Sequence, residues 1–500
     1  MKALRLILVF ALLQCIIAFL TVGGNFFHEE SMWHYIGRNW FRLGLTPYAG
    51  GVDNKSPLIF AVYGLSDLLF GLNFWFPRLL GIVCQSVGIY YLYKIAVHIS
   101  GANENSKPQE VGIITITIYG LSLLWRATGG KYVSFTETYA ITFLILAVYY
   151  YLCYVPVLSQ THSRSERRSL FLSGLMAGIG LAWRISAAFG ISAILLHAIS
   201  RRRAALVPFI SGLITAIVAL AVIAMMAGIS LQDIYLYAFA ENFGSGSTTD
   251  HSLGWKLNSF VDSFFYSELL IFYPLIAAYY LFKKQFGLSA ATSFLTLWLI
   301  LEFIGVNVPG IYARPHFKHL LPVMSLMSGI AVVHIINNYA LSIRHVLIAI
   351  WVLFIPKVTE PLYALRSSTP QLRSGAINCN PPYPRPNEAA EKNLGLWIRE
   401  RTQAQDHVLV AGFGARVQLY SARLSPSVYF NVTQTPRAKK QFMSEVIANK
   451  PAIIVVPIFP DYKVHVQEDL RSFIDSVAAK EYSKTEDCLY GYAIYRRTAR

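Results

Sequence analysis

Long apolar runs separated by short polar segments occupy the first 356 residues of the chain. Several runs approach the ~20 residues that a helix needs to cross a bilayer. The predicted spans are residues 1–22, 77–98, 111–125, 135–155, 170–183, 185–200, 204–227, 264–282, 286–305, 320–336 and 345–356. The first run could instead be a cleaved signal peptide, but its length and the lack of a small-x-small cleavage site favour an uncleaved helix. The pattern therefore predicts an all-α polytopic membrane protein with about eleven transmembrane helices.

Composition and charge support this class and orient the spans. The chain is 55% hydrophobic and only 14% charged, which excludes an ordinary soluble enzyme. Its net charge of +16 comes largely from Lys and Arg clusters between the runs, as expected for loops on the cytoplasmic side. This distribution argues against nucleic acid as a partner. The Lys and Arg clusters lie on the cytoplasmic side only if residues 58–72 lie along the outer surface of the membrane and do not cross the bilayer. In that topology, residues 357–500 are extracytoplasmic.

The pattern changes after residue 356. Residues 357–387 form a Pro-rich linker, and residues 388–500 are predicted to be a small α/β domain. Helices are expected at 388–401, 416–422, 438–448 and 467–478, and strands at 407–410, 452–456 and 490–495. Cys379 and Cys488 flank this region, and they could pair if it is exported. The predicted organisation is a transmembrane catalytic domain over 1–356, with a first external loop at 23–76, followed by the linker and the tail domain.

Ionisable residues that this topology places outside are the candidates for chemistry, because charge at membrane depth is costly and usually serves a site. Guanidinium and ammonium groups suit a phosphate, although snorkelling to lipid headgroups is the competing explanation. Carboxylates nearby could act as a base or orient an acceptor, although Glu29 and Glu30 could also be the acidic start of a surface helix. The cations are Lys55, Arg126, Lys131, Arg184, Lys256, Arg314 and Lys318, with His316 and His319 beside the last two; the carboxylates include Glu29, Glu30, Asp53 and Glu137.

The first external loop carries a set of short motifs. They are His28-Glu29-Glu30, Tyr35-Ile36-Gly37, Pro47-Tyr48 and Asp53-Asn54-Lys55-Ser56-Pro57, followed by Phe76-Pro77-Arg78-Leu79-Leu80. This arrangement resembles the first external loop of the dolichyl-phosphate-mannose protein mannosyltransferase-like group of GT-C membrane glycosyltransferases, which includes bacterial aminoarabinose transferases. The cluster of Arg314, His316 and His319 before Leu320-Leu321-Pro322 is similar to the late motif of that group. The resemblance covers roughly residues 1–356 and is weak in the tail.

The resemblance implies a transferase that takes one sugar from a polyprenyl-phosphate donor, with inversion, and places it on an extracytoplasmic glycan, lipid or protein acceptor. It puts Glu29 where the group carries its catalytic Asp, one methylene longer, with Glu30 and Asp53 as orienting groups. Lys55 stands where the group has a lysine near the carrier phosphate. Further phosphate partners are Arg184, Arg314, His316, Lys318 and His319, and substrate contacts are expected from Tyr35, Glu137 and Tyr312.

Adjacent residues such as Glu29 and Glu30 do not point the same way on a helix, so we expect no metal site and no cofactor. The chain lacks the large inserted lumenal domain of eukaryotic protein mannosyltransferases, which favours a multi-pass protein of the bacterial inner (plasma) membrane. Two other classes of function stay open. A transporter or flippase of lipid-linked sugars would carry cations at several depths of the bundle. A non-catalytic assembly subunit for envelope glycans would bind partners through its tail.

Overall fold

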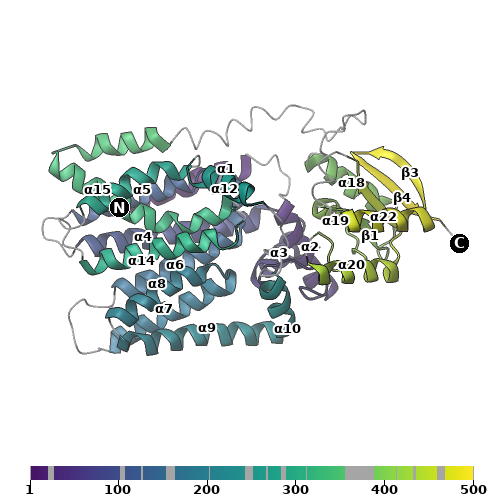
Figure 1. Cartoon of the computed structure of the whole chain (residues 1–500), viewed down its shortest axis with the longest axis horizontal. Helices are drawn as coiled ribbons and strands as arrows, with labels where there is room; N and C mark the ends of the chain where they lie inside the picture. Colours follow the sequence, from purple (N-terminus) through teal and green to yellow (C-terminus); the bar gives the residue numbers. More distant parts are fainter. Residues whose placement is uncertain are drawn as a thin grey trace. The chain divides into compact units, whose positions relative to one another are not determined.

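The computed structural model describes residues 2–20, 28–101, 107–125, 128–153, 164–201, 203–241, 252–265, 268–282, 289–310, 312, 314–354, 388–412, 414–431, 435–458 and 468–498. These residues are mostly helical, with one small sheet near the C-terminus, as predicted (Figure 1). Contacts divide the chain into two units, and each is described by itself. The helical unit comprises Met1–Thr21, Arg78–Ile223 and His251–Leu365; the sheet unit comprises Val22–Pro77, Ala224–Asp250 and Arg366–Arg500.

The helical unit is built from apolar helices joined by short 3-10 turns. Its elements, two of which extend slightly beyond the unit's bounds, are α1 Lys2–Leu20, α4 Trp75–Ser100, α5 Pro108–Ser122, η1 Gly130–Ser134, α6 Thr136–Cys153, α7 Arg164–Trp183, α8 Ala187–Arg201, η2 Arg203–Ala205, α9 Leu206–Met226, α12 Leu253–Phe264, η4 Glu268–Ile271, α13 Phe272–Phe282, α14 Ser289–Asn307, η5 Arg314–His319, α15 Leu321–Asn338 and a last helix Ile343–Phe354. The order follows the predicted spans closely.

Four of the described helices are long and apolar enough to cross a membrane, and a bent pair at Leu253–Phe264 and Glu268–Phe282 makes up to five. They are Lys2–Phe19, Trp75–Ser100, Arg203–Met226 and Leu321–Asn338. Shorter apolar helices lie at Ala187–Ser200, Thr292–Asn307 and Ile343–Phe354, where spans were also predicted. The count of eleven stays a prediction.

The helices pack closely where small residues face a neighbour. A Cβ atom on Gly329 of α15 would lie 2.1 Å from Thr115 Oγ1 of α5, so only glycine allows this approach. Such small-residue contacts are typical of helix pairs in membranes, where van der Waals packing replaces the hydrophobic driving force. The outer surface of α9 exposes large apolar side chains, unlike the surface of a soluble protein: Val207 and Met226 are 73% and 83% exposed. This surface is suited to lipid.

The sheet unit combines the C-terminal domain with two segments from earlier in the chain. Its elements are α2 His28–Leu43, α3 Pro57–Phe70, α10 Leu231–Asp233, the π-helix η3 Ile234–Ala240, α18 Glu388–Glu400, β1 Val408–Val410, α19 Ala415–Ser421, α20 Pro436–Asn449, β2 Ile453–Pro457, α22 Glu468–Glu481, β3 Tyr482–Leu489 and β4 Tyr492–Arg497. The strand order is β1-β2-β4-β3; β1 and β2 are parallel, and the other neighbours are antiparallel.

The predicted helices and strands of the tail are present within a few residues of their expected ends, but the sequence reading missed β3. This strand reads Tyr-Ser-Lys-Thr-Glu-Asp-Cys-Leu and is exposed over most of its length, so it lacks the apolar alternation that identifies a strand. Charged edge strands of this kind discourage pairing with other chains. Cys488 of β3 takes part in a disulfide. Its predicted partner, Cys379, lies outside the described residues, so that pairing stays a prediction.

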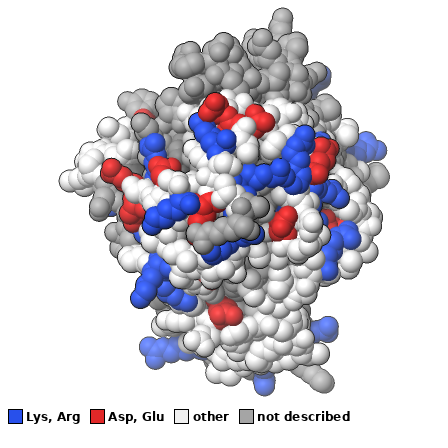
Figure 2. Space-filling view, turned by 90° about the vertical axis from the view of Figure 1, so that its right-hand side faces the viewer, with Lys and Arg blue, Asp and Glu red and all other residues white. Residues whose placement is uncertain are grey.

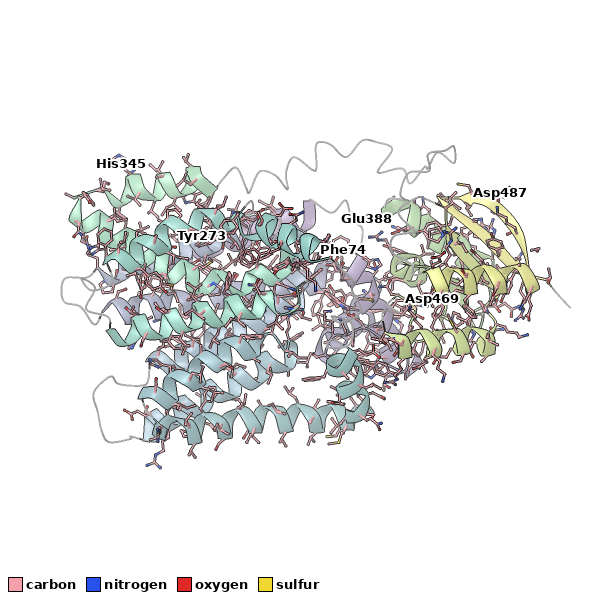
Figure 3. All side chains as sticks on the ribbon, in the orientation of Figure 1. Phe74, Tyr273, His345, Glu388, Asp469 and Asp487 are labelled. Atoms are coloured by element: carbon pink, nitrogen blue, oxygen red, sulfur yellow. The ribbon has the colours of Figure 1, made fainter. Side chains whose placement is uncertain are left out.

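Charged side chains of both signs are interspersed over the face shown in Figure 2. In the sheet unit, Lys439 Nζ of α20 lies 2.8 Å from Asp469 Oδ2 of α22, and Asp469 and Asp487 are labelled in Figure 3. A mixed charged surface is typical of a domain that faces water. The tail therefore differs in surface character from helices such as α9.

Helices α2 and α3 cross at two glycines. A Cβ atom on Gly37 would lie 2.4 Å from the Phe60 carbonyl oxygen, and one on Gly64 would lie 2.6 Å from the Gly37 oxygen. On its other side α2 packs against α19 of the C-terminal domain. The backbone N–H of Val52 donates to the Val428 carbonyl at 2.8 Å. The first external loop is thus packed into one unit with the tail, a grouping that the sequence did not indicate.

Candidate functional site

Glu29 and Glu30 begin helix α2 but have different surroundings. Glu29 is half-buried, whereas Glu30 is fully buried with 0% exposure. Successive residues on a helix point about 100° apart, which explains the difference. Glu30 lies in the field of Arg416 on α19, a guanidinium that also pairs with Glu388 and Glu391. Of the two carboxylates, Glu29 is the more accessible.

Asp53 and Lys55 lie in the turn before α3, and Asp53 is 3% exposed. Its Oδ2 accepts from Trp33 Nε1 at 2.8 Å, and its Oδ1 accepts from the Asn54 backbone N–H at 2.8 Å. Lys55 Nζ lies 3.9 Å from Asp53 Oδ1 and donates to the Asn54 side chain. Asp53 therefore organises the turn and holds the Lys55 ammonium, whose side chain remains a quarter exposed.

Tyr35, expected to contact substrate, is 2% exposed. Its hydroxyl accepts from the Ser425 backbone N–H at 2.8 Å, and its ring lies 4.5 Å from that of Phe430, centroid to centroid. Burial raises the pKa of its hydroxyl. These contacts favour a role in joining α2 to the tail, while its contact with substrate stays a prediction.

In the helical unit, Arg184 and Glu137 form the centre of a polar cluster. Arg184 follows the end of α7, and Glu137 lies in the first turn of α6 with 2% exposure. Arg184 Nη1 lies 3.1 Å from Glu137 Oε1 and donates to Thr136 Oγ1 at 3.2 Å. The guanidinium keeps 17% exposure, so part of it reaches the surface of the unit. A cation held in this way can meet an anionic ligand.

Three basic residues of η5 join the same cluster. His316 Nε2 lies 3.9 Å from Glu137 Oε1. Lys318 donates to the Tyr132 carbonyl at 2.5 Å and to Thr138 Oγ1 at 3.0 Å. Burial lowers the pKa of Lys318 to about 7, and the Glu137 carboxylate opposes this shift. The ammonium group is therefore close to losing its charge at neutral pH.

His319 is 3% exposed and faces Ser186, whose Oγ lies 3.1 Å from its Nε2. Burial, followed by the neighbouring Arg184 guanidinium, lowers the pKa of His319 to about 3. The ring is thus neutral near pH 7. Since a neutral imidazole offers one donor and one acceptor, its two nitrogens have opposite roles toward their partners.

The remaining candidates are less connected to these groups. The Tyr312 hydroxyl donates to Asn307 Oδ1 at 3.1 Å, and its ring packs edge-on to Phe264, with the centroids 6.1 Å apart. Arg314 begins η5, but its side chain lies outside the described part of the chain, as do Arg126 and the side chain of Lys131. Within the described residues, the structure gathers Glu137, Arg184, His316, Lys318 and His319 in the helical unit, and Glu29, Glu30, Tyr35, Asp53 and Lys55 in the sheet unit.

Sequence reasoning missed Glu302 and Ser186. Glu302 lies in α14 with 1% exposure, and its Oε2 is 3.6 Å from His319 Nδ1. It is the one carboxylate in the apolar run 286–305, a pattern that marks a site because such a group is costly in a membrane. Ser186 carried no comparable signal, because a serine in a turn between helices is common.

A polar triad formed by the buried His34 and Asp67 with the exposed Arg42 was also not predicted. His34 Nε2 lies 3.1 Å from Asp67 Oδ1, and Arg42 pairs with the same carboxylate. Burial lowers the pKa of His34, while Asp67 opposes the shift. The triad joins α2 to α3, and Glu30 of α2 also acts electrostatically on His34. No cluster of three or more His, Cys, Asp or Glu suited to a metal occurs among the residues that the structure describes.

Comparison with known proteins extends these observations. A sequence model of the dolichyl-phosphate-mannose-protein mannosyltransferase family matches residues 54–227, which include Lys55, Glu137 and Arg184. A search of curated protein sequences finds no match.

Two solved structures have the same fold. ArnT from Cupriavidus metallidurans, in a crystal structure bound to undecaprenyl phosphate, is 13% identical, with a TM-score of 0.64 over 98% of each chain. The archaeal oligosaccharyltransferase AglB from Archaeoglobus fulgidus, in complex with an inhibitory peptide and a dolichol-phosphate, is 10% identical, with a TM-score of 0.55 over 99% of this chain and 74% of that chain. The predicted resemblance to the mannosyltransferase-like and ArnT-like group of GT-C glycosyltransferases is confirmed.

Proposed function

We propose that this chain transfers a sugar from a polyprenyl-phosphate donor to an acceptor outside the cytoplasm. The observation that carries the proposal is the cationic cluster of the helical unit, where Arg184, His316 and Lys318 lie around the buried Glu137. A guanidinium held by one carboxylate, with further basic side chains beside it, suits a phosphate group. The family match and the ArnT-like fold support a lipid-linked donor.

The proposed reaction is a single displacement with inversion. The acceptor oxygen attacks the anomeric carbon, and the bond between that carbon and the donor phosphate oxygen breaks. Polyprenyl phosphate leaves with the bonding electrons, and the acceptor proton passes to the Glu29 carboxylate. Glu29 is the proposed base because its side chain is the more accessible of the two acidic groups that begin α2.

The other site residues have supporting roles in the proposal. Lys55, held beside Asp53, and the cluster of Arg184, His316 and Lys318 stabilise the charge of the departing phosphate, and Arg314 is assigned the same role from the sequence resemblance alone. Glu30 and Asp53 orient their neighbours, since both are buried. Tyr35, Glu137 and Tyr312 are proposed substrate contacts, although Glu137 is also the anion that holds Arg184.

The proposed setting is the bacterial inner membrane, crossed about eleven times, with the tail domain on the extracytoplasmic side. An acceptor in a glycan, a lipid or a protein is compatible with this location. The mixed charged surface of the sheet unit supports contact with water. The apolar exposed surface of α9 supports contact with lipid.

Mass spectrometry of copurified lipid tests the proposal. The full-length protein, its Glu29→Gln variant and a Glu110→Gln control are purified in mild detergent. Glu110 lies at the start of α5, with its Oε2 3.7 Å from Lys107 Nζ, and is distant in sequence from every candidate. We expect a polyprenyl-phosphate sugar to be enriched in Glu29→Gln, since the donor binds but is not consumed. Full transfer activity in Glu29→Gln would refute the assignment of the base, and sugar lipid carried without any transfer by the unaltered protein would favour a transporter.

A further inference from the structure

Glu302 of α14 is a buried carboxyl group with partners on two sides. Its Oε1 accepts from Trp298 Nε1 at 3.1 Å, and its Oε2 lies 3.6 Å from His319 Nδ1. The backbone of α8 passes closely on a third side, because a Cβ atom on Gly190 would lie 2.5 Å from Oε1. The carboxyl group is therefore held in place by packing as well as by polar contacts.

His319 connects this carboxyl group to Arg184. Its other nitrogen, Nε2, lies 3.1 Å from Ser186 Oγ, and the same hydroxyl accepts from Arg184 Nε at 3.1 Å. The polar contacts thus run from Glu302 through His319 and Ser186 to Arg184, and they join α14, η5 and the turn between α7 and α8. Both nitrogens of His319 face protein groups.

A purely structural explanation of this chain of contacts is weak. Leucine at position 302 would fill similar volume without the cost of burying a carboxyl group among apolar helices. Arginine has a long flexible side chain, and its binding to a phosphate depends on the orientation of its planar donors. Arg184 is held on one edge by Glu137 and Thr136 through Nη1, and on another by Ser186 through Nε. Two fixed edges define the plane of the guanidinium.

We propose that Glu302 is a positioning residue that fixes the guanidinium of Arg184, through His319 and Ser186, in the orientation that binds the phosphate of a lipid-linked donor. The inference rests on the proposed function and refines it. His319 supports Arg184 in this arrangement instead of contacting the phosphate. The 3.6 Å separation between Glu302 and His319 is longer than a hydrogen bond, and contacts of this kind commonly tighten when a ligand binds.

A double-mutant cycle measures whether these residues act as one unit. Binding of undecaprenyl phosphate to the full chain in mild detergent is compared for the unaltered protein, Glu302→Leu, Ser186→Ala and the combined variant. We expect each single variant to bind about tenfold more weakly and the combined variant to lose little more, because either change breaks the same connection. Ser173→Ala is the matched control, since its buried hydroxyl donates to the Ala147 carbonyl outside this cluster and its loss leaves affinity unchanged.

A second cycle separates positioning from a general loss of structure. In an Arg184→Met background, Glu302→Leu leaves the residual affinity unchanged, because there is no guanidinium to orient. Additive losses in either cycle, or unchanged affinity in Glu302→Leu, overturn the inference. If Glu302→Leu does not fold, Glu302→Gln takes its place in the cycle, because glutamine has nearly the same volume as glutamate. Losses of affinity that add up when Glu302→Gln is combined with Ser186→Ala would again contradict the inference. Absence of binding by the folded, unaltered protein refutes the proposed function instead.

Discussion

Arg416 is the residue whose removal tests most directly whether the C-terminal domain holds the loop that carries Glu29. Its guanidinium is 6% exposed, pairs with Glu391 and lies 3.5 Å from Glu388, which is labelled in Figure 3. Glu391 also accepts from the Tyr492 hydroxyl at 3.2 Å. Glu30 acts on the same guanidinium from α2. Arg416→Met keeps most of the side-chain volume and removes the charge together with the N–H donors.

The expected loss of stability is large because the partners stay buried. Glu391 is 8% exposed and Glu30 is 0% exposed, so neither carboxylate gains water when the guanidinium is removed. Removing one member of a buried ion pair typically costs about 3–5 kcal/mol. A free-energy change of about 1.4 kcal/mol corresponds to a factor of ten in an equilibrium constant. Local opening of this part of the sheet unit should therefore become roughly 100-fold to 3,000-fold more frequent.

Hydrogen–deuterium exchange followed by mass spectrometry on the full chain measures this opening. We expect faster exchange in both α2 and α19 of Arg416→Met. Arg401→Met is the control, because Arg401 is 44% exposed and stacks over Trp397 at the surface. Exchange in α2 that stays within threefold of the control would refute the idea that the tail secures this helix through Arg416.

Two pH effects follow from buried bases. Burial lowers the pKa of His34 below its value in the unfolded chain, so the stability that the neutral ring contributes should be complete above about pH 6.5 and should be lost as the pH falls below it. Urea unfolding of the protein at pH 7 and pH 5 measures this loss. The His34→Gln variant should show little difference in stability between the two pH values. Burial lowers the pKa of Lys318 to about 7, so affinity for undecaprenyl phosphate should fall as the pH rises from 6 to 8. Lys318→Arg keeps its charge over this range and should bind with a flatter pH profile; an equally steep profile would show that Lys318 does not contact the phosphate.

Local patterns predicted many of the individual elements. The tail helices and three of its strands were recognised from apolar periodicity, and the missed strand β3 is the one whose exposed polar sequence carries no such signal. Candidate site residues were recognised because charge is rare in apolar surroundings. The same reasoning applied to the run 286–305 would have found Glu302, whose burial at 1% agrees with the rule.

The sequence by itself determined which segments are apolar, where many of the helices lie to within a few residues, and which charges needed an explanation, because hydrophobicity and charge are properties of each residue. Only the tertiary structure decided which of those charges meet. Arg184 contacts Glu137 and connects to Glu302, and Arg416 of the tail lies near Glu30 of the first loop, although these partners are far apart along the chain. Such pairs depend on how helices pack, and packing is set by the summed contacts of many side chains.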